Sequence, residues 1–285
     1  MTNRVAILTP DVGGPTYQSR WREVFARMAA PLEAEGLWVE ERSWTDAGDL
    51  TPFALVLPLL VWGYYASAEW SDRVARWEGR GVRLRNPANV LRWNADKLYL
   101  KRLADRGAAT VPTLYVERVT EEALEEAAAA FGTRRLVAKP RISAGAFRTV
   151  RWSPGAPLDE APTAEAMIQP YLPSIETEGE VSLIYLGGRF SHAIRKVPQP
   201  GDFRVQPEYD GIISAHEPAP DEYAAAEAAL KAAEEPLLYA RVDLVRDLEG
   251  RPALIELELV EPDLYLGFDA AAPARFAEAV RSALS

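Results

Sequence analysis

Residues 253–262 form the stretch ALIELELVEP, in which apolar side chains alternate with carboxylates. The density of Leu, Ile and Val indicates a buried β-strand. Side chains two positions apart on a strand lie on the same face, so Glu256 and Glu258 share one face while Leu257 and Leu259 share the other. Two like charges side by side are destabilising unless they face water or a cation. Both alternatives are open on this segment alone.

The segment before this stretch predicts a β-hairpin. Residues 238–246 form a second apolar run, and Glu249-Gly250 suits a two-residue turn between the runs. A hairpin with that turn brings two pairs of residues opposite each other, namely Asp243 with Glu256 and Arg241 with Glu258.

The predicted pairing gathers Asp243, Glu256 and Glu258 into one acidic cluster with Arg241 beside it. Burial would strengthen the repulsion within the cluster unless a metal ion or Arg241 neutralised it. Hard oxygen ligands of this kind suit Mg²⁺. A solvated hairpin face with ordinary Arg–Glu pairs explains the same residues equally well.

The composition describes a globular protein with few means of nucleophilic catalysis. The chain has 285 residues, of which 48% are hydrophobic, enough to bury a sizeable core. Its formal net charge of -10 argues against nucleic acid as a partner. With no cysteine there is no disulfide, thiolate nucleophile or cysteine-bound metal. His192 and His216 lack metal-ligand spacing, so histidine-centred catalysis has little support.

No apolar run approaches the length of a membrane span, and the N-terminus MTNRVAILTP turns polar too soon for a signal peptide. We therefore expect a cytoplasmic protein with no membrane partner. A homodimer is the default expectation for a soluble enzyme.

Periodicity along the chain predicts its secondary structure. The first 85 residues indicate a small α/β layer with parallel strands, expected at 4–9, 37–44, 54–59 and 82–84. A helix with Asn94 as its N-cap and Lys97 in its first turn is expected to end at Gly107. Later helices are expected at 120–131, 221–235 and 273–284.

A second group of residues suits phosphate binding. Lys139 ends the apolar run LVA, and a loop of small residues that includes Ser143 and Gly145 follows it. A lysine beside exposed backbone N–H groups can hold phosphate oxygens. The loop is not a GxxxxGK[ST] motif, and a solvent-exposed strand end is the alternative.

Taken in order, the motifs resemble the ATP-grasp superfamily. They are NADK (94–97), VAKP (137–140), MIQPYL (167–172), GEVSL (179–183), GDFR (201–204), RVD (241–243) and IELEL (255–259). The resemblance covers roughly residues 86–265. It implies a glutathione synthetase-like ATP-binding fold, α/β or α+β, in which an N-terminal α/β domain (1–88) precedes two α+β subdomains (89–165 and 166–285) that grip ATP between them.

The resemblance also implies residues for the nucleotide. Lys97 and Lys139 would contact its phosphates, and the loop with Ser143 and Gly145 would fold over them. Gln169 and the backbone around Tyr171 and Leu172 would bind adenine, although a core role for the Tyr171 ring is equally open. Glu180 would accept hydrogen bonds from the ribose, with Glu176 and Glu178 as competitors.

Asp243, Glu256 and Glu258 would hold one or two Mg²⁺ ions, with Mn²⁺ as a substitute. Many members of the superfamily carry Asn at the third position, so Glu258 adds a negative charge that Arg241 or a second ion must balance. Three further cations would stabilise the transferring phosphoryl group or the substrate carboxylate, in the order Arg204, Arg195 and Lys196.

The implied function is that of an ATP-dependent carboxylate–amine ligase. It would convert a small amino-acid-like carboxylate into an acyl phosphate, release ADP and phosphate, and join the acyl group to an amine. LVWGYY (60–65) narrows the resemblance to the group that includes the D-cycloserine-forming ligase, which implies an intramolecular cyclisation. The acceptor-pocket candidates are Trp62, Tyr64, Tyr65 and Asp11. The alternatives are an ATP- and Mg²⁺-binding protein without ligase activity, a small-molecule kinase, and a two-metal phosphohydrolase.

Overall fold

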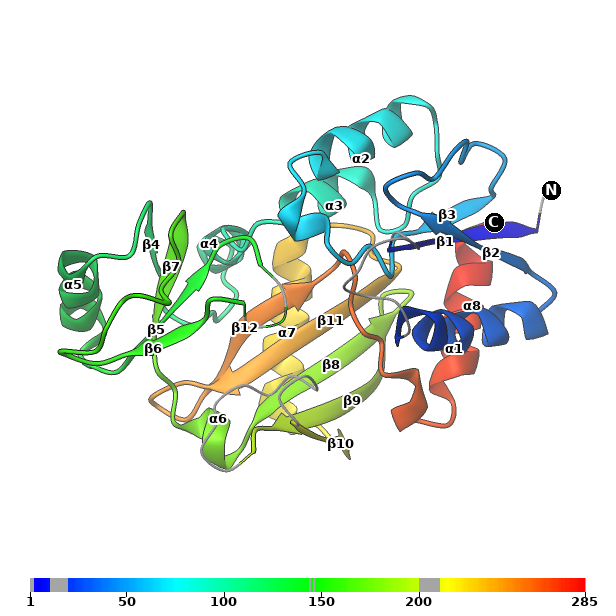
Figure 1. Cartoon of the computed structure of the whole chain (residues 1–285). Helices are drawn as coiled ribbons and strands as arrows, with labels where there is room; N and C mark the ends of the chain where they lie inside the picture. Colours follow the sequence, from blue (N-terminus) through cyan, green and yellow to red (C-terminus); the bar gives the residue numbers. More distant parts are fainter. Residues whose placement is uncertain (1–2, 11–19, 144, 146, 200–210, 285) are drawn as a thin grey trace.

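The structure is a computed structural model that describes residues 3–10, 20–143, 145, 147–199 and 211–284 (Figure 1). In this part of the chain the strands form sheets of three, four and five strands. Helices pack on these sheets, so the predicted mixed α/β class is confirmed. No helix of the described part is both long and apolar enough to cross a membrane.

The three-stranded sheet is parallel and comes from the N-terminal part of the chain. Its strands lie in the order β2 (Trp38–Ser43), β1 (Arg4–Thr9), β3 (Leu55–Leu57). Residues of β1 alternate between two apolar clusters, one with α1 (Arg20–Ala34) and α8 (Ala272–Leu284) and the other with α2 (Trp70–Gly79). The predicted parallel layer is confirmed, but the strand expected at 82–84 is reduced to a bridge between Val56 and Leu84.

The four-stranded sheet is antiparallel. Its order is β4 (Leu114–Val116), β7 (Ala166–Pro170), β5 (Leu136–Pro140), β6 (Val150–Trp152). The helix α5 (Glu121–Phe131) packs against it through Leu124. Thr120 caps this helix by accepting a hydrogen bond from the backbone N–H of Ala123 at 3.1 Å, which is why the helix begins where the sequence predicts.

The five-stranded sheet carries the alternating carboxylates. Its order is β10 (Ile212–His216), β9 (Arg189–Val197), β8 (Glu180–Leu186), β11 (Tyr239–Arg246), β12 (Pro252–Glu258). On one face, residues such as Leu183, Val242 and Leu257 pack against α4 (Tyr99–Asp105) and α7 (Pro220–Ala233), which lies behind the sheet in Figure 1. The opposite face holds Glu180 and Asp243. The remaining short helices are α3 (Ala88–Trp93), α6 (Ser174–Thr177), η1 (Tyr64–Ala66) and η3 (Leu266–Phe268).

The predicted hairpin register is confirmed, although the predicted turn is wrong. Arg241 pairs with Glu258 and Asp243 pairs with Glu256. The connection is longer than two residues, because the Asp247 N–H donates to the carbonyl of Arg251 at 2.8 Å. This turn pairs Leu244 with Leu254, one position away from the expected register. A bulge that leaves Ile255 as the extra residue on β12 restores the register at the carboxylates.

Side chains of residues 94–99 cover the edge of β12 that does not pair with β11. Asn94 donates to the Leu257 carbonyl and accepts from the Leu259 N–H, both at 2.8 Å, and the Leu257 N–H donates to the Tyr99 hydroxyl at 2.9 Å. The prediction of Asn94 as a helix N-cap is therefore wrong. It follows the last residue of α3, and its amide satisfies buried backbone groups of an edge strand.

The buried side chain of Asn86 links the N-terminal layer to the five-stranded sheet, beside the apolar contacts between them. Its amide donates to the carbonyls of Tyr239 at 3.0 Å and Leu259 at 2.8 Å, and its oxygen accepts from the Leu238 N–H at 2.8 Å. The residue is 0% exposed. Loss of the amide would leave three buried backbone groups without partners, which is costly.

We predict that Asn86→Ala lowers the free energy of unfolding by about 3 kcal/mol, because unpaired buried polar groups each cost on the order of 1–3 kcal/mol. Urea denaturation followed by circular dichroism measures this change. Asn89→Ala, at an exposed position three residues away, is the matched control and should change stability little. Equal effects of the two substitutions would contradict the proposed role of the Asn86 hydrogen bonds.

Candidate active site

A cleft lies between the four-stranded and five-stranded sheets, and it gathers most of the residues predicted from the sequence. Its walls include residues of β5 and β7 on one side and of β8, β9, β11 and β12 on the other. The predicted residues that line it are Lys97, Lys139, Ser143, Gly145, Gln169, Tyr171, Leu172, Glu180, Arg241, Asp243, Glu256 and Glu258.

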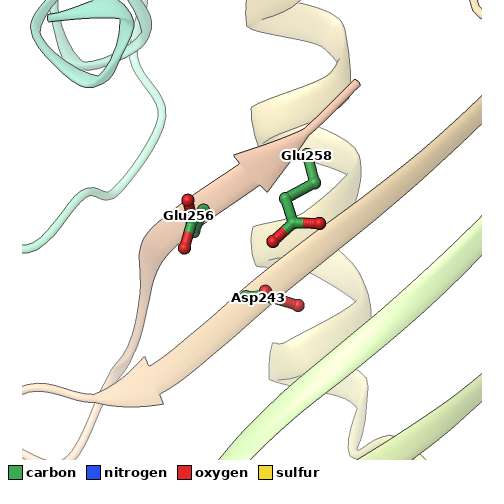
Figure 2. A group of neighbouring side chains, drawn as sticks. All are labelled: Asp243, Glu256 and Glu258. Carbon is green, nitrogen blue, oxygen red and sulfur yellow. The ribbon is translucent and has the colours of Figure 1, made fainter. Parts of the chain in front are cut away.

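The acidic cluster lies on the side of the cleft that the five-stranded sheet forms. Asp243, Glu256 and Glu258 each offer one oxygen, and these oxygens lie within 4.8 Å of one another. Figure 2 shows that they come from two neighbouring strands, β11 and β12. A set made only of carboxylate oxygens in this spacing fits a hard divalent cation such as Mg²⁺.

Basic side chains and a hydroxyl stabilise the cluster. The Arg241 guanidinium donates to Asp243 at 3.0 Å and also binds Glu258, while the Ser182 hydroxyl donates to Asp243 at 2.6 Å. Lys196 lies 3.6 Å from Asp243 and forms an ion pair with Glu180. Arg241, Asp243 and Lys196 are 7%, 1% and 5% exposed, so these charges are held largely out of water.

Lys97 and Lys139 reach the cluster from outside the five-stranded sheet. The Lys97 ammonium lies 3.2 Å from Glu256 and donates to the Ser143 carbonyl at 2.7 Å. It sits in the turn before α4, where its backbone N–H bonds to Arg141 at 3.0 Å, and not in the first turn of a long helix as predicted. Lys139 comes from β5, and its charge acts on Glu256.

Burial and neighbouring charges shift the protonation of the site. Burial raises the pKa of Glu258 to about 8, although Arg241 offsets part of the effect. Burial also opposes ionisation of Glu256, but Lys97 and Lys139 outweigh it and hold the pKa of Glu256 below its usual range. Burial lowers the pKa of Lys139 to about 8. A lysine with a lowered pKa gains from an anionic partner, because the partner stabilises its charged form.

One end of the cleft is apolar. Leu172, Val111 and Val245 form a small buried cluster there, with Ile255 and Ile175 packed against it. Gln169 lies beside this end and donates to the Thr113 hydroxyl at 2.9 Å. The Tyr171 ring is 3% exposed and stacks near the Arg135 guanidinium, 4.5 Å from the ring centre. An apolar wall with a few polar groups suits a planar ligand.

Not every predicted residue joins the cleft. Arg195 lies on the opposite face of β9 from Lys196 and borders a small pocket with Glu178 and Glu222, because successive side chains of a strand alternate between its faces. Lys196, ranked third from the sequence, is the residue of β9 that faces the cluster. Arg204 and Asp11 lie outside the described residues.

Several residues that line the cleft are not predicted from the sequence, or are predicted only as one of several candidates. Tyr265 and Glu261 follow β12 in an irregular segment, where no periodicity indicates the direction of a side chain. Tyr265 lies beneath the Arg241 guanidinium, 5.7 Å from the ring centre. Of the aromatic residues of LVWGYY, Tyr64 lines the cleft, whereas Trp62 packs against the hydrophobic core.

Comparison with known proteins identifies the family. No protein-family profile matches the chain. The cycloserine biosynthesis protein DcsG of Streptomyces lavendulae is 30% identical over 275 residues, covering 87% of this chain and 90% of that protein. The crystal structure of the D-cycloserine synthetase DcsG superposes with a TM-score of 0.83 at 28% identity, over 99% of this chain and 100% of that one. The chain belongs to the DcsG family of ATP-grasp ligases.

More distant structures share the fold of this ligase. D-alanine–D-alanine ligase from Bacillus anthracis superposes with a TM-score of 0.72 at 17% identity, covering 99% and 97% of the two chains. The ATP-grasp ligase PsnB, in complex with a precursor variant, Mg and ADP, gives a TM-score of 0.70 at 17% identity over 100% and 99%. The predicted ATP-grasp fold and ligase class are confirmed, and a binding protein without ligase activity is not favoured.

We predict that Lys196→Met lowers the free energy of unfolding by about 3 kcal/mol, because it leaves the Glu180 carboxylate buried without its partner. Burial already raises the pKa of Glu180, and loss of Lys196 raises it further. A carboxyl group whose pKa is raised on folding destabilises the folded protein at pH values where the group is ionised. Lys196→Met should therefore lower the free energy of unfolding more at pH 8 than at pH 5. Urea denaturation at pH 5 and at pH 8 measures the free energy of unfolding. Lys231→Met, exposed on α7, is the control, and an equal deficit at the two pH values would contradict the pairing.

Proposed function

We propose that the ligase activates the carboxylate of a small amino-acid-like substrate as an acyl phosphate and joins it to an amine. The substrate carboxylate attacks the γ-phosphorus of ATP and ADP leaves; the amine then attacks the acyl carbon, phosphate leaves, and the amine gives up a proton. The observation that carries this proposal is the cleft, in which two lysines, three clustered carboxylates and an apolar end lie together.

The apolar end of the cleft provides the proposed adenine site. Gln169 offers its amide beside the buried surface of Leu172, and the backbone at Tyr171 and Leu172 borders the same space. Glu180 takes the proposed ribose role, because it lines the cleft. Its two competitors, Glu176 and Glu178, do not line the cleft; Glu176 binds the Tyr171 hydroxyl and Glu178 lies 3.8 Å from Arg246.

The phosphates are proposed to lie between Lys97, Lys139 and the loop that carries Ser143 and Gly145. Gly145 has a positive φ of 60°, and an added Cβ would meet nothing within 4 Å, so its backbone is open to a close ligand. Lys97 already ties the loop to the acidic cluster through the Ser143 carbonyl and Glu256. This link supports a loop that closes over bound phosphates.

The acidic cluster is proposed to hold Mg²⁺ through Asp243, Glu256 and Glu258. The ion supplies neutralisation of the charge that develops on the phosphates. Arg241 offsets the extra negative charge of Glu258, to which it is bound. Arg241 and Lys196 line the same cleft and would bind the transferring phosphoryl group.

The comparisons also support a finer proposal on the product. A relative that covers most of this chain is named for cycloserine biosynthesis, so ring closure within one amino-acid-like molecule is the form of ligation we propose.

We further propose that residues 1–88, 89–165 and 166–285 act as the three units of the enzyme, with ATP bound between the second and third.

The first experiment tests turnover of ATP with Mg²⁺ across a panel of amino acids and amines. We expect ADP and phosphate to appear only with particular substrates, and the product to lack one molecule of water. Glu256→Gln should reduce the rate by at least about 100-fold, because it weakens both the metal site and the Lys97 contact. Glu249→Gln, in the exposed β11–β12 turn, is the matched control. Release of AMP would overturn the acyl-phosphate mechanism.

Lys139→Met tests the nucleotide site separately. We predict that it weakens ATP binding by about 30-fold, since a charge-assisted hydrogen bond contributes on the order of 1.5–3 kcal/mol. Isothermal titration calorimetry with ATP and Mg²⁺ measures the dissociation constant. Lys101→Met, an exposed lysine of α4, provides the control. An unchanged dissociation constant would remove Lys139 from the proposed site.

A further inference from the structure

Glu261 is a carboxylate of the cleft that the proposed mechanism does not use. It lies three residues beyond Glu258 and lines the same cleft. Three residues span at most about 11 Å, so Glu261 lies within reach of a small molecule whose other end is at the metal site. It is not part of the acidic cluster formed by Asp243, Glu256 and Glu258.

One oxygen of the Glu261 carboxylate has no hydrogen-bond partner among the described residues. This atom, Oε2, is buried. Lys97, Lys196 and Arg241, three cations of the cleft, are each within ion-pair distance of other carboxylates. A buried acceptor left unpaired is costly, so such a group in a ligand cleft indicates a partner that arrives with the ligand.

The charged residues that line the cleft indicate the charge of the ligand group that would bind Glu261. Five carboxylates line it, namely Glu180, Asp243, Glu256, Glu258 and Glu261. Four cationic side chains face them, namely Lys97, Lys139, Lys196 and Arg241. Lys97, Lys196 and Arg241 pair with Glu256, Glu180 and Glu258, and no ion pair among the described residues reaches Glu261. A cationic group at this position would balance it.

Tyr64 gives the cleft a second feature that suits a cation. It lines the cleft, and its ring packs against Trp70 at 5.2 Å and Tyr65 at 5.9 Å between ring centres, which fixes its position. Burial raises the pKa of the Tyr64 hydroxyl, and the charge of Glu261 adds to that rise, so Glu261 acts on Tyr64 within the cleft. An aromatic ring beside a carboxylate is a common arrangement for binding an ammonium group.

We propose that Glu261 and Tyr64 bind the primary ammonium group of the amino-acid substrate and so select amino acids over simple carboxylic acids. This inference rests on the proposed function, because it assumes that the substrate carboxylate is phosphorylated beside the acidic cluster. The ammonium group then lies at the end of the cleft beyond Glu258, and the apolar end holds the nucleotide.

A cycle of substitutions in protein and substrate tests the inference. The panel of amino acids is extended with a matched analogue of each member in which hydrogen replaces the amino group. ADP release by the wild-type ligase and by Glu261→Gln is then measured on the best amino acid and its analogue. We expect Glu261→Gln to reduce kcat/KM for the amino acid by about 30-fold and to leave that for the analogue unchanged. The control Glu249→Gln should retain the wild-type melting temperature.

An equal loss on both substrates, or an unchanged preference for the amino acid in Glu261→Gln, would overturn the ammonium site while leaving the ligase function intact. Weaker binding of ATP and Mg²⁺ by Glu261→Gln would instead make Glu261 part of the metal site. Absence of ADP release with every acid of the panel would overturn the proposed function, and the inference with it.

Discussion

The paired strands β11 and β12 hold three carboxylates within 4.8 Å of one another, and the rest of the cleft is arranged around that concentration of charge. Buried like charges are unfavourable unless cations and hydrogen-bond donors approach them closely. The protein supplies Arg241 from the same strand, Lys196 from β9 and Lys97 from the turn before α4. These cations come from distant parts of the sequence, so the acidic cluster ties the turn before α4 to the five-stranded sheet.

The hairpin register shows why the alternation of side chains predicts which face of a strand they occupy more reliably than it predicts the length of the connecting turn. The period of two places Glu256 and Glu258 on one face whatever connects the strands. The actual turn is longer than expected, and the bulge at Ile255 moves the pairing by one residue at the carboxylates. Bulges and turns depend on local backbone geometry, which the alternation of side chains does not encode.

The sequence could predict residues whose chemistry is unusual for their position, such as carboxylates in an apolar strand and Lys139 at the end of another. It could not choose between Arg195 and Lys196, because that choice depends on how β9 pairs with β8. It also assigned Asn94 to a helix cap, a local role, whereas the amide satisfies the edge of β12. Glu261 and Tyr265 follow the strand in an irregular segment without periodicity, so only the folded chain shows where they lie.

One strand links the chemically distinct parts of the cleft. Ile255 borders the apolar end, Glu256 and Glu258 belong to the acidic cluster, and the chain then continues to Glu261. The separations between these parts are therefore set by covalent geometry and backbone hydrogen bonds, which Asn94 and Tyr99 hold along the free edge of the strand. A ligase that forms no covalent bond to its substrate depends on the placement of its reactants. A strand fixed along its length achieves that placement with little loss of entropy during the reaction.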